Sequence, residues 1–273
     1  GGATVGAMWK NGSSMAVEEI NASGGILGKK IKLEFIDTAS DPGKARAAVQ
    51  RALDDKPIAI FGPIYSGSVS ATLKLTNDAE VPQVMGGEAG PLTAQGSKYL
   101  FRTSFGQNVS MPKIANYLRD GVKAKTVAVV YVNNDFGKGG RDAITKELAA
   151  REIKVVADIS TEAGQADFAA DVIKLKGANA DAIFVYLNEE ESARFLREAK
   201  KQGLNKPLIG ETTLLGQKVI ELAGDAANGV KGHVGLTVDA PVPAIQEFGK
   251  KYEAKYKSKP DHNGVKGYIA PYM

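Results

Sequence analysis

The chain has 273 residues, of which 43% are hydrophobic and 24% are charged. This is the composition of an ordinary globular protein, and the length favours one large or two medium α/β units. The 35 basic residues exceed the 31 acidic ones by a margin too thin to favour a nucleic-acid partner. The absence of cysteine excludes disulfides, thiolate catalysis and cysteine-bound zinc.

The apolar runs of the chain are short. The longest, such as residues 127–132 and 182–187, fall far below the roughly 20 residues that cross a bilayer, so we expect no membrane insertion. The chain has no charged start followed by an apolar stretch and a cleavage site, and we expect that any export signal has been removed. That absence does not favour the cytoplasm.

The first hundred residues read as helices and strands in alternation. Residues 1–6 suggest a loop that enters a helix over about residues 8–20, and the glycines at 24–25 end this helix. Asp41-Pro42 is typical of a helix start, since proline in the first turn loses no hydrogen bond. Because this architecture should begin with a strand and extend past a final helix, we expect the opening strand and the last segment to be missing.

Short apolar runs typical of buried strands recur along the whole chain. The expected strands are residues 31–36, 58–61, 83–85, 126–132, 154–159, 182–187, 207–210 and 232–237. One more strand is expected before Arg102. Alternation of such strands with helical segments predicts parallel sheets covered by helices on both faces.

Three further helices are predicted after residue 106, and the one before Gly203 is the best marked. Acidic residues at 189–191 and basic residues at 200–201 match the two ends of the dipole of a helix that stops before Gly203. A second helix holds Ile114 and its apolar neighbours. The lysine tract at 250–259 predicts an amphipathic surface helix.

The α/β pattern restarts after residues 102–106, and a second hinge candidate lies at residues 238–241. We therefore predict two similar α/β units, or lobes, of typical domain size. Lobe 1 is expected to comprise residues 1–106 and 240–273, and lobe 2 residues 107–239.

Catalytic and cofactor chemistry finds little support. His233 and His262 stand in unrelated contexts, so a histidine relay or metal pair is not expected, and both are predicted to be surface or loop residues. The glycines at 24–28 and 137–140 lack the strand–turn–helix spacing of a nucleotide site. The acids at 189–191 point around a helix and cannot converge on one ion. We expect no cofactor, no metal and no enzyme activity.

Residues 61–68 are the one segment for which we predict a binding function, because they follow an apolar strand and open a helix. Free N–H groups and the hydroxyls of Ser66 and Ser68 at this point suit a carboxylate, and Gly67 would let a ligand approach closely. In open parallel sheets, ligands bind at such strand ends. The alternative is that Ser66 or Ser68 merely caps the helix.

Five segments in the same order resemble the leucine/isoleucine/valine-binding family of type I periplasmic binding proteins. They are residues 16–28, 41–42, 61–68, 134–139 and 195–203, and the resemblance covers nearly the whole chain. It implies two Rossmann-like lobes with parallel sheets that close by a hinge over a ligand in the cleft between them.

The resemblance also implies a function and partners. We expect an extracytoplasmic, monomeric protein that captures a small amino acid or related carboxylate and delivers it to the membrane permease of an ABC transporter. Its compartment would be the periplasm, or the cell exterior with a membrane tether in a Gram-positive source. A ligand-sensing receptor or regulator on the same fold is the alternative, because the two differ in partners and not in the pocket.

By position in the family, serines of lobe 1 hold the ligand carboxylate and the turn at residues 86–90 faces the amino group. Lobe 2 supplies an aromatic lid, a ligand-facing loop and the position of the acid that pairs with the ammonium. The implied ligand-binding residues are Tyr65, Ser66, Gly67, Ser68, Gly87, Glu88, Ala89, Phe136, Asn188, Glu211 and Thr212.

Two departures from the family pattern concern the ligand's charge. Thr212, and not Glu211, aligns best with the acidic position, and Glu88 places an acid where the family has a hydroxyl residue. The sequence therefore leaves the ammonium partner open between Glu88 and Glu211, and leaves the identity of the ligand open.

Overall fold

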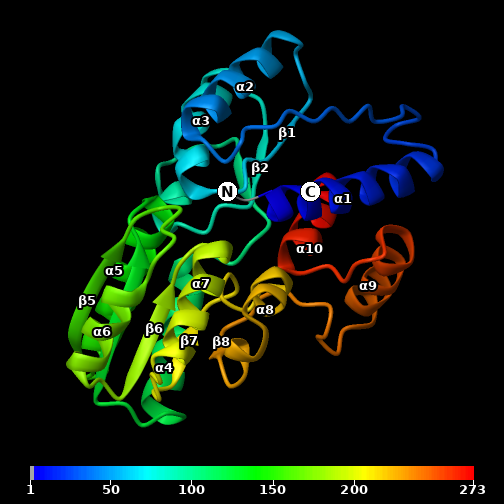
Figure 1. The fold of residues 1–273 in the computed structure, drawn as a ribbon. Coiled ribbons are helices and arrows are strands. Elements are labelled where there is room, and N and C mark those ends of the chain that lie inside the picture. The colour runs from blue at the N-terminus through cyan, green and yellow to red at the C-terminus, as the bar shows by residue number, and fades with distance from the viewer. Residues whose placement is uncertain (1–2) are drawn as a thin grey trace. The chain divides into compact units, whose positions relative to one another are not determined.

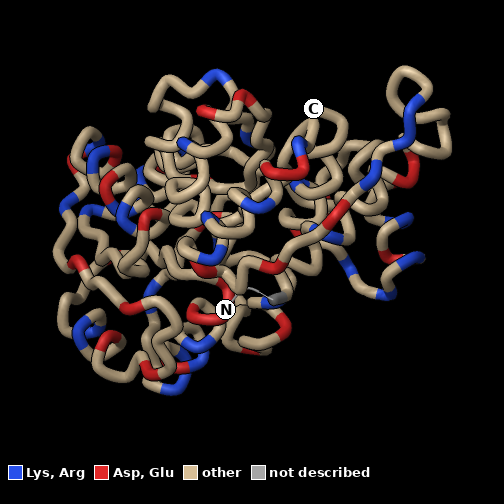
Figure 2. The backbone as a smooth tube through the Cα atoms, turned by 90° about the horizontal axis from the view of Figure 1, so that it is seen from above, with Lys and Arg blue, Asp and Glu red and all other residues tan. Residues whose placement is uncertain are grey.

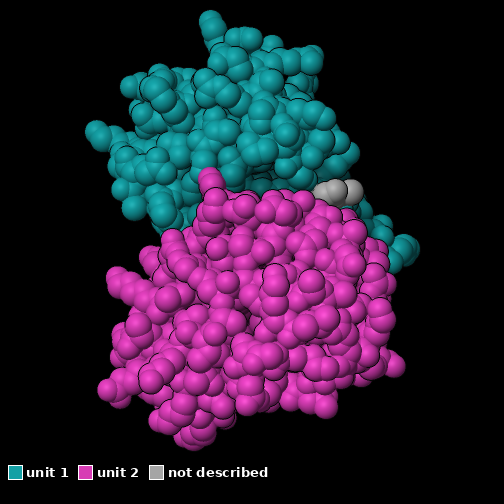
Figure 3. Space-filling view, turned by 60° about the vertical axis from the view of Figure 1, so that its left-hand side comes forward, with its two compact units in different colours: residues 1–105, 236–273 teal, residues 106–235 magenta. Residues whose placement is uncertain are grey.

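The computed structural model describes residues 3–273, which fall into two compact units. Unit 1 comprises residues 1–105 and 236–273, and unit 2 comprises residues 106–235 (Figure 3). Unit 2 is one continuous stretch of chain, whereas unit 1 is assembled from two stretches.

The described part of unit 1 contains a small parallel sheet and five α-helices (Figure 1). Its strands are β1 Ile60–Phe61, β2 Gln83–Met85 and β3 Leu100–Arg102, paired in the order β1-β2-β3. Its helices are α1 Ala3–Ala22, α2 Pro42–Asp54, α3 Ser66–Asp78, α9 Pro243–Tyr256 and α10 His262–Ile269. Short 3-10 helices cover Gly90–Ala94 and Ala270–Tyr272.

Unit 2 contains a five-stranded parallel sheet in the order β5-β4-β6-β7-β8. Its strands are β4 Thr126–Val132, β5 Lys154–Thr161, β6 Ala182–Tyr186, β7 Leu208–Gly210 and β8 Lys231–Gly232. Its helices are α4 Gln107–Asp120, α5 Asp135–Ala149, α6 Ala169–Ala178, α7 Glu189–Lys201 and α8 Gln217–Ala223, with a 3-10 helix at Gly224–Ala227. Helix α4 packs on α5, and α7 packs on α6 and α8. The central strand β6 is buried along its whole length, as expected for a strand covered on both faces.

Glycines bring the first and last helices of unit 1 into close contact. A Cβ atom on Gly12 of α1 would overlap the backbone carbonyl of Gly264 in α10, and one on Gly267 would overlap the backbone of Trp9. The Ser13 hydroxyl donates a hydrogen bond of 3.0 Å to the carbonyl of Gly267. Residues more than 250 positions apart in sequence are therefore locked together.

The glycines at 137 and 140 likewise allow close packing, in this case of helix α5 on the sheet of unit 2. A Cβ on Gly137 would overlap the carbonyl of Val132 at the end of β4, and one on Gly140 would overlap the ring of Tyr186 in β6. These glycines let α5 lie directly on the sheet, which accounts for a glycine-rich tract that has no nucleotide-site spacing.

Most predicted elements are confirmed. Strands β2 and β4 have the predicted bounds, and α2 starts as predicted, with Asp41 accepting a bond of 2.7 Å from the N–H of Lys44. Helix α7 carries its acidic and basic turns at the predicted ends, and Gly203 follows with a φ of 65°. Helix α9 is amphipathic, with Tyr252 buried and the lysines exposed.

Three predictions about elements are wrong. The segment 31–36 is not a strand: no strand within residues 3–273 pairs with it, and its Phe35 and Ile36 are 45% and 48% exposed. The strand predicted at 232–237 is limited to Lys231–Gly232, because the chain passes into unit 1 at residue 236. The loop predicted for residues 1–6 is helical from Ala3 onward, and residues 1 and 2 lie outside the described part.

Charge is distributed as the composition suggests. Figure 2 shows basic and acidic residues interspersed along the backbone. None of the described helices is long and apolar enough to cross a membrane.

Candidate ligand-binding site

The first helix N-terminus of interest follows β1. Helix α3 begins at Ser66, and its N-cap position is occupied by Tyr65, so neither serine of this segment caps the helix. Ser66 is 1% exposed, and its hydroxyl accepts a bond of 3.1 Å from the N–H of Ala89. The alternative in which Ser66 or Ser68 serves only as a cap is therefore wrong, and Ser66 joins the end of β1 to the turn after β2.

Ser68 has a different environment. Its side chain is 1% exposed, and in the described part of the chain its Oγ has no hydrogen-bond partner. Buried polar side chains are normally paired, because an unpaired one loses its hydration without compensation. The Ser68 hydroxyl therefore marks a place where a polar group of a ligand would be stabilised.

The turn at residues 86–90 is tightly held. A Cβ on Gly86 would lie 2.9 Å from the Trp9 ring, and one on Gly87 would lie 3.0 Å from Leu92. The Arg102 guanidinium donates a bond of 2.6 Å to the carbonyl of Ala89. Because β1 and β2 are parallel neighbours, this turn and the start of α3 lie at the same edge of the unit 1 sheet.

Glu88 already has a cation beside it. Its Oε1 lies 2.6 Å from Nζ of Lys266 in α10, and the two side chains are only 8% and 4% exposed. This buried ion pair lies entirely within unit 1. Nothing in the sequence close to Glu88 indicates this pairing.

His262 corrects a prediction, because it is buried and not a surface residue. It is 4% exposed in the first turn of α10, and burial together with the nearby charge of Lys266 lowers the pKa of its imidazole well below the ordinary value. His233 does lie in a loop, as predicted, but only 14% of its side chain is exposed.

In unit 2, Glu211 directly follows strand β7 and is 1% exposed. Its Oε1 accepts a bond of 2.8 Å from the Thr212 hydroxyl and lies 3.2 Å from Nδ1 of His233. Its Oε2 has no hydrogen-bond partner among the residues that the structure describes. The Glu211 carboxylate thus has one hydrogen-bonded oxygen, and its other oxygen has no partner among the described residues. The Thr212 hydroxyl already donates its hydrogen bond to Glu211.

Phe136 lies in the first turn of α5, just past the end of β4. Its ring stacks on that of Tyr186 with centroids 4.1 Å apart, and its carbonyl accepts a bond of 2.8 Å from Gln107. The side chain is 9% exposed, so in unit 2 it is largely covered.

Asn188 occupies the N-cap position of α7, just past β6, and its amide donates a bond of 3.0 Å to Glu191. Glu191 is 4% exposed and also accepts a bond of 2.6 Å from the N–H of Gly164. The acidic first turn of α7 therefore does more than complement the helix dipole. Since β4, β6 and β7 are parallel neighbours, Phe136, Asn188 and Glu211 all follow strand ends at one edge of the unit 2 sheet.

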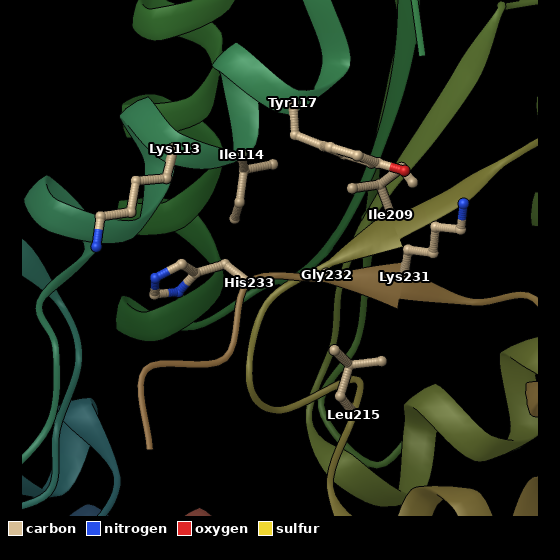
Figure 4. Close-up of a pocket in the computed structure, with 8 residues that line it drawn as sticks. All are labelled: Lys113, Ile114, Tyr117, Ile209, Leu215, Lys231, Gly232 and His233. Carbon is tan, nitrogen blue, oxygen red and sulfur yellow. The ribbon is translucent and has the colours of Figure 1, made fainter. Parts of the chain in front are cut away.

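A pocket of about 520 Å³ lies elsewhere in unit 2, between α4 and the edge of the sheet (Figure 4). Its lining residues are Lys113, Ile114, Tyr117, Ile209, Leu215, Lys231, Gly232 and His233. None of the predicted ligand-binding residues is among them, and the lining residue His233 contacts Glu211.

Sequence reasoning missed Lys266 and the role of His233. Lys266 had a signal, because it is the one charged residue between positions 262 and 273, among glycines and apolar residues. A lone lysine in such a segment requires a partner if the helix is buried. His233 had no comparable signal, since its contact with Glu211 depends on how β8 pairs with β7. Among the described residues, no group of histidines and acids could hold a metal ion.

Both units have the parallel α/β architecture of type I periplasmic binding proteins, and the predicted residues of each unit follow strand ends. The sequence model of the family described as "Periplasmic binding protein" matches residues 1–273. The chain belongs to this family, which comprises solute-binding proteins and not enzymes. Both the predicted fold class and the resemblance to the leucine/isoleucine/valine-binding group are confirmed.

The relatives point to the same group. The leucine-, isoleucine-, valine-, threonine- and alanine-binding protein of Pseudomonas aeruginosa is 29% identical over 229 residues, which is 84% of this chain and 61% of that protein. The structure of the leucine-binding protein LivK of Thermotoga maritima has a TM-score of 0.92 and 25% identity, covering 100% of this chain and 77% of that one. LivJ of Streptococcus pneumoniae, a branched-chain amino acid transporter substrate binding protein solved in complex with isoleucine, has a TM-score of 0.89 and 29% identity, covering 99% of this chain and 78% of that one. The chain thus spans less than two thirds of the length of the Pseudomonas relative.

Proposed function

We propose that this protein captures a small amino acid, with a branched-chain amino acid as the first candidate, for an ABC uptake system. One observation carries the proposal: Ser68 Oγ and Glu211 Oε2, from two of the predicted ligand-binding residues, are buried and unpaired in the described chain. One atom suits a carboxylate and the other an ammonium. An α-amino acid carries both groups.

The carboxylate is bound by the start of α3. The first N–H groups of a helix have no partner within the helix and carry its positive dipole end, so they attract an anion. The Ser68 hydroxyl adds a donor there, while Gly67 has its nearest neighbour for a Cβ, Pro42, at 3.7 Å and leaves the backbone accessible. Tyr65 and Ser66 position this segment, and Gly87 and Ala89 belong to the turn beside it.

The ammonium is bound by Glu211, with Thr212 and Asn188 beside it and Phe136 packing on the ligand's side chain. Glu88, the other candidate, has its charge balanced by Lys266, whereas Glu211 has an unpaired oxygen. A buried carboxylate is stabilised by a cation, and a ligand ammonium provides one.

Transport and not sensing is the proposed role, because the relatives named above are binding proteins for amino acids and include the substrate binding protein of a transporter. The protein would act outside the cytoplasm as a monomer and deliver its ligand to a membrane permease. Its lobes would close on the ligand about hinges near Gly106 and Asp239, so saturation with ligand should lower the radius of gyration in solution scattering. A radius that stays the same would contradict hinge closure.

A ligand panel tests the proposal directly. The panel contains L-leucine, L-isoleucine, L-leucinamide without the carboxylate charge, and 4-methylpentanoate without the amino group. A ligand at about 100 times its dissociation constant adds about 2.7 kcal/mol of stability, which is roughly 5–10 °C in melting temperature for a chain of this size. We expect L-leucine or L-isoleucine to give such a shift and both truncated analogues to bind more weakly. If none of the four raises the melting temperature, the proposal is wrong.

A further inference from the structure

The pocket between α4 and the edge of the unit 2 sheet has no part in the function proposed above. Its volume of about 520 Å³ lies within the range of roughly 300–1,000 Å³ that is typical of small-molecule sites. Its lining comes from α4, from β7 and the turn after it, and from β8 and the residue after it (Figure 4). All of these elements belong to unit 2, so the pocket is formed within a single unit.

Apolar side chains form the floor and one wall of this pocket. Ile114 and Ile209 are each 2% exposed, and Leu215 lies half-buried among the same lining residues. The Tyr117 side chain is 38% exposed and extends from α4 across the pocket (Figure 4). Its ring packs directly on Gly121, where a Cβ atom would lie 2.6 Å from it. This surface can bury the apolar body of a ligand, which is favourable because apolar area is removed from water.

One end of the pocket presents a cation and a hydroxyl group. Lys231 of β8 is exposed, and it has no ion-pair partner among the described residues. In Figure 4 the Lys231 ammonium and the Tyr117 hydroxyl lie at the same end of the pocket. Within the described chain, no acidic residue lines the pocket. An anionic group of a ligand at this end would therefore meet a positive charge and a hydrogen-bond donor.

The opposite end of the pocket has mixed charge. His233 lies there in Figure 4, and its Nδ1 is 3.2 Å from Oε1 of the buried Glu211. Lys113 adds an ammonium at the same end (Figure 4). Because the Glu211 carboxylate opposes a second anion there, the Lys231 end is the favourable one for a negatively charged group.

We propose that this pocket is a second binding site of the protein, and that it takes a small monocarboxylate with an apolar, aromatic body. The carboxylate binds at Lys231 and the Tyr117 hydroxyl, and the body lies on the apolar floor. A free amino acid is a poor occupant, because its ammonium would lie close to that of Lys231. The site is separate from the residues assigned to the amino acid and does not depend on that assignment.

Three phenyl compounds with the same carbon chain test the proposal, namely 4-phenylbutanoate, 4-phenylbutanamide and 4-phenylbutylamine. The readout is the dissociation constant of each compound from titration calorimetry at neutral pH. We expect the wild-type protein to bind the acid about fivefold more tightly than the amide, as for a partly exposed charge pair. The amine should bind most weakly, because its charge has the same sign as that of Lys231.

Variants of Lys231 place the bound acid in the pocket. In Lys231→Met the acid and the amide should bind with nearly equal affinity, and in Lys231→Glu the amine should bind more tightly than the acid. Because Lys231 is exposed, neither change disturbs the core, and the reversed preference is a gain of binding that misfolding cannot produce. Lys146→Met removes the same charge from an exposed position of α5 outside the pocket and should leave all three affinities unchanged.

Tyr117→Ala removes the apolar wall and should weaken the binding of all three compounds. If the wild-type protein binds none of them, the apolar floor serves only the packing of α4 on the sheet and the inference is wrong. An acid preference that is the same in both Lys231 variants would place the acid elsewhere in the protein and would also overturn the inference. Displacement of the acid by L-leucine would have the same meaning, since it would place the acid at the amino-acid site.

Discussion

Replacing Ser68 with alanine separates ligand binding from folding better than any other substitution at the site. The Ser68 hydroxyl is buried and unpaired in the described chain, so the folded protein loses no internal hydrogen bond when it is removed. An unpaired buried polar group costs about 1–3 kcal/mol, and alanine also favours a helix over serine by a few tenths. We therefore expect the free energy of unfolding without ligand to stay the same or rise.

Affinity should respond in the opposite direction. A hydrogen bond to a charged group is worth about 1.5–3 kcal/mol, which corresponds to roughly 10- to 150-fold in the dissociation constant. Titration calorimetry with L-leucine, combined with chemical unfolding of the ligand-free protein, measures both quantities. Affinity for L-leucinamide should fall by a smaller factor, because its amide carries no charge.

Two further substitutions serve as controls for Ser68→Ala. Ser70→Ala, on the exposed side of the same helix, should change neither quantity. Ser66→Ala leaves the buried N–H of Ala89 without its acceptor and should reduce the free energy of unfolding by about 1–3 kcal/mol. If Ser68→Ala binds L-leucine within a factor of two of wild type, the reasoning about the carboxylate site is wrong.

Three other predictions concern the charge, pH response and packing of the two units. Glu211→Gln should weaken L-leucine binding at least tenfold in calorimetry and leave 4-methylpentanoate unaffected; equal losses for both would contradict an ammonium contact. Because the pKa of His262 is lowered by burial, the unfolded chain takes up a proton below about pH 6.5 that the folded chain does not, so the free energy of unfolding should fall by up to about 1.4 kcal/mol per pH unit as the pH drops toward the lowered pKa. His262→Gln should flatten this slope in denaturant titrations at several pH values, and an unchanged slope would assign it to other groups. Gly140→Ala should destabilise unit 2 by about 1–3 kcal/mol through overlap with Tyr186, whereas Gly177→Ala, with open space around it in α6, should be neutral or stabilising in thermal unfolding.

The elements that the sequence predicted well are those whose signal is local. Strand β4 and helix α7 owe their pattern to apolar runs, end charges and a stop glycine, all within one segment. Residues 31–36 have the same apolar pattern as a strand, but a strand also needs a neighbour to pair with, and pairing is not encoded in the segment itself. The strand expected at 232–237 is short because the chain leaves one unit there for the other.

The same distinction holds for the site. The position of Ser66 and Ser68 at a strand end followed from the local pattern, whereas the partners of Glu88 and Glu211 did not. Lys266 lies 178 residues from Glu88, and His233 lies 22 residues from Glu211, in the loop after strand β8. Contacts of this kind arise from topology, so the sequence alone could not decide which acid remains available to a ligand.

The contact between α1 and α10 has a consequence for how the protein is made. Unit 2 is contiguous, and its contacts can form as soon as residue 235 has been synthesised. Unit 1 cannot complete its fold until α10, residues 262–269, has been synthesised. The contact between α1 and α10 closes a loop of most of the chain, which is entropically costly and slow. During synthesis the first hundred residues therefore lack the helix that completes their core, and Glu88 lacks its lysine. The turn beside Ser66 should acquire its final form in the last folding step, so that the proposed carboxylate site is complete only after α10 has formed.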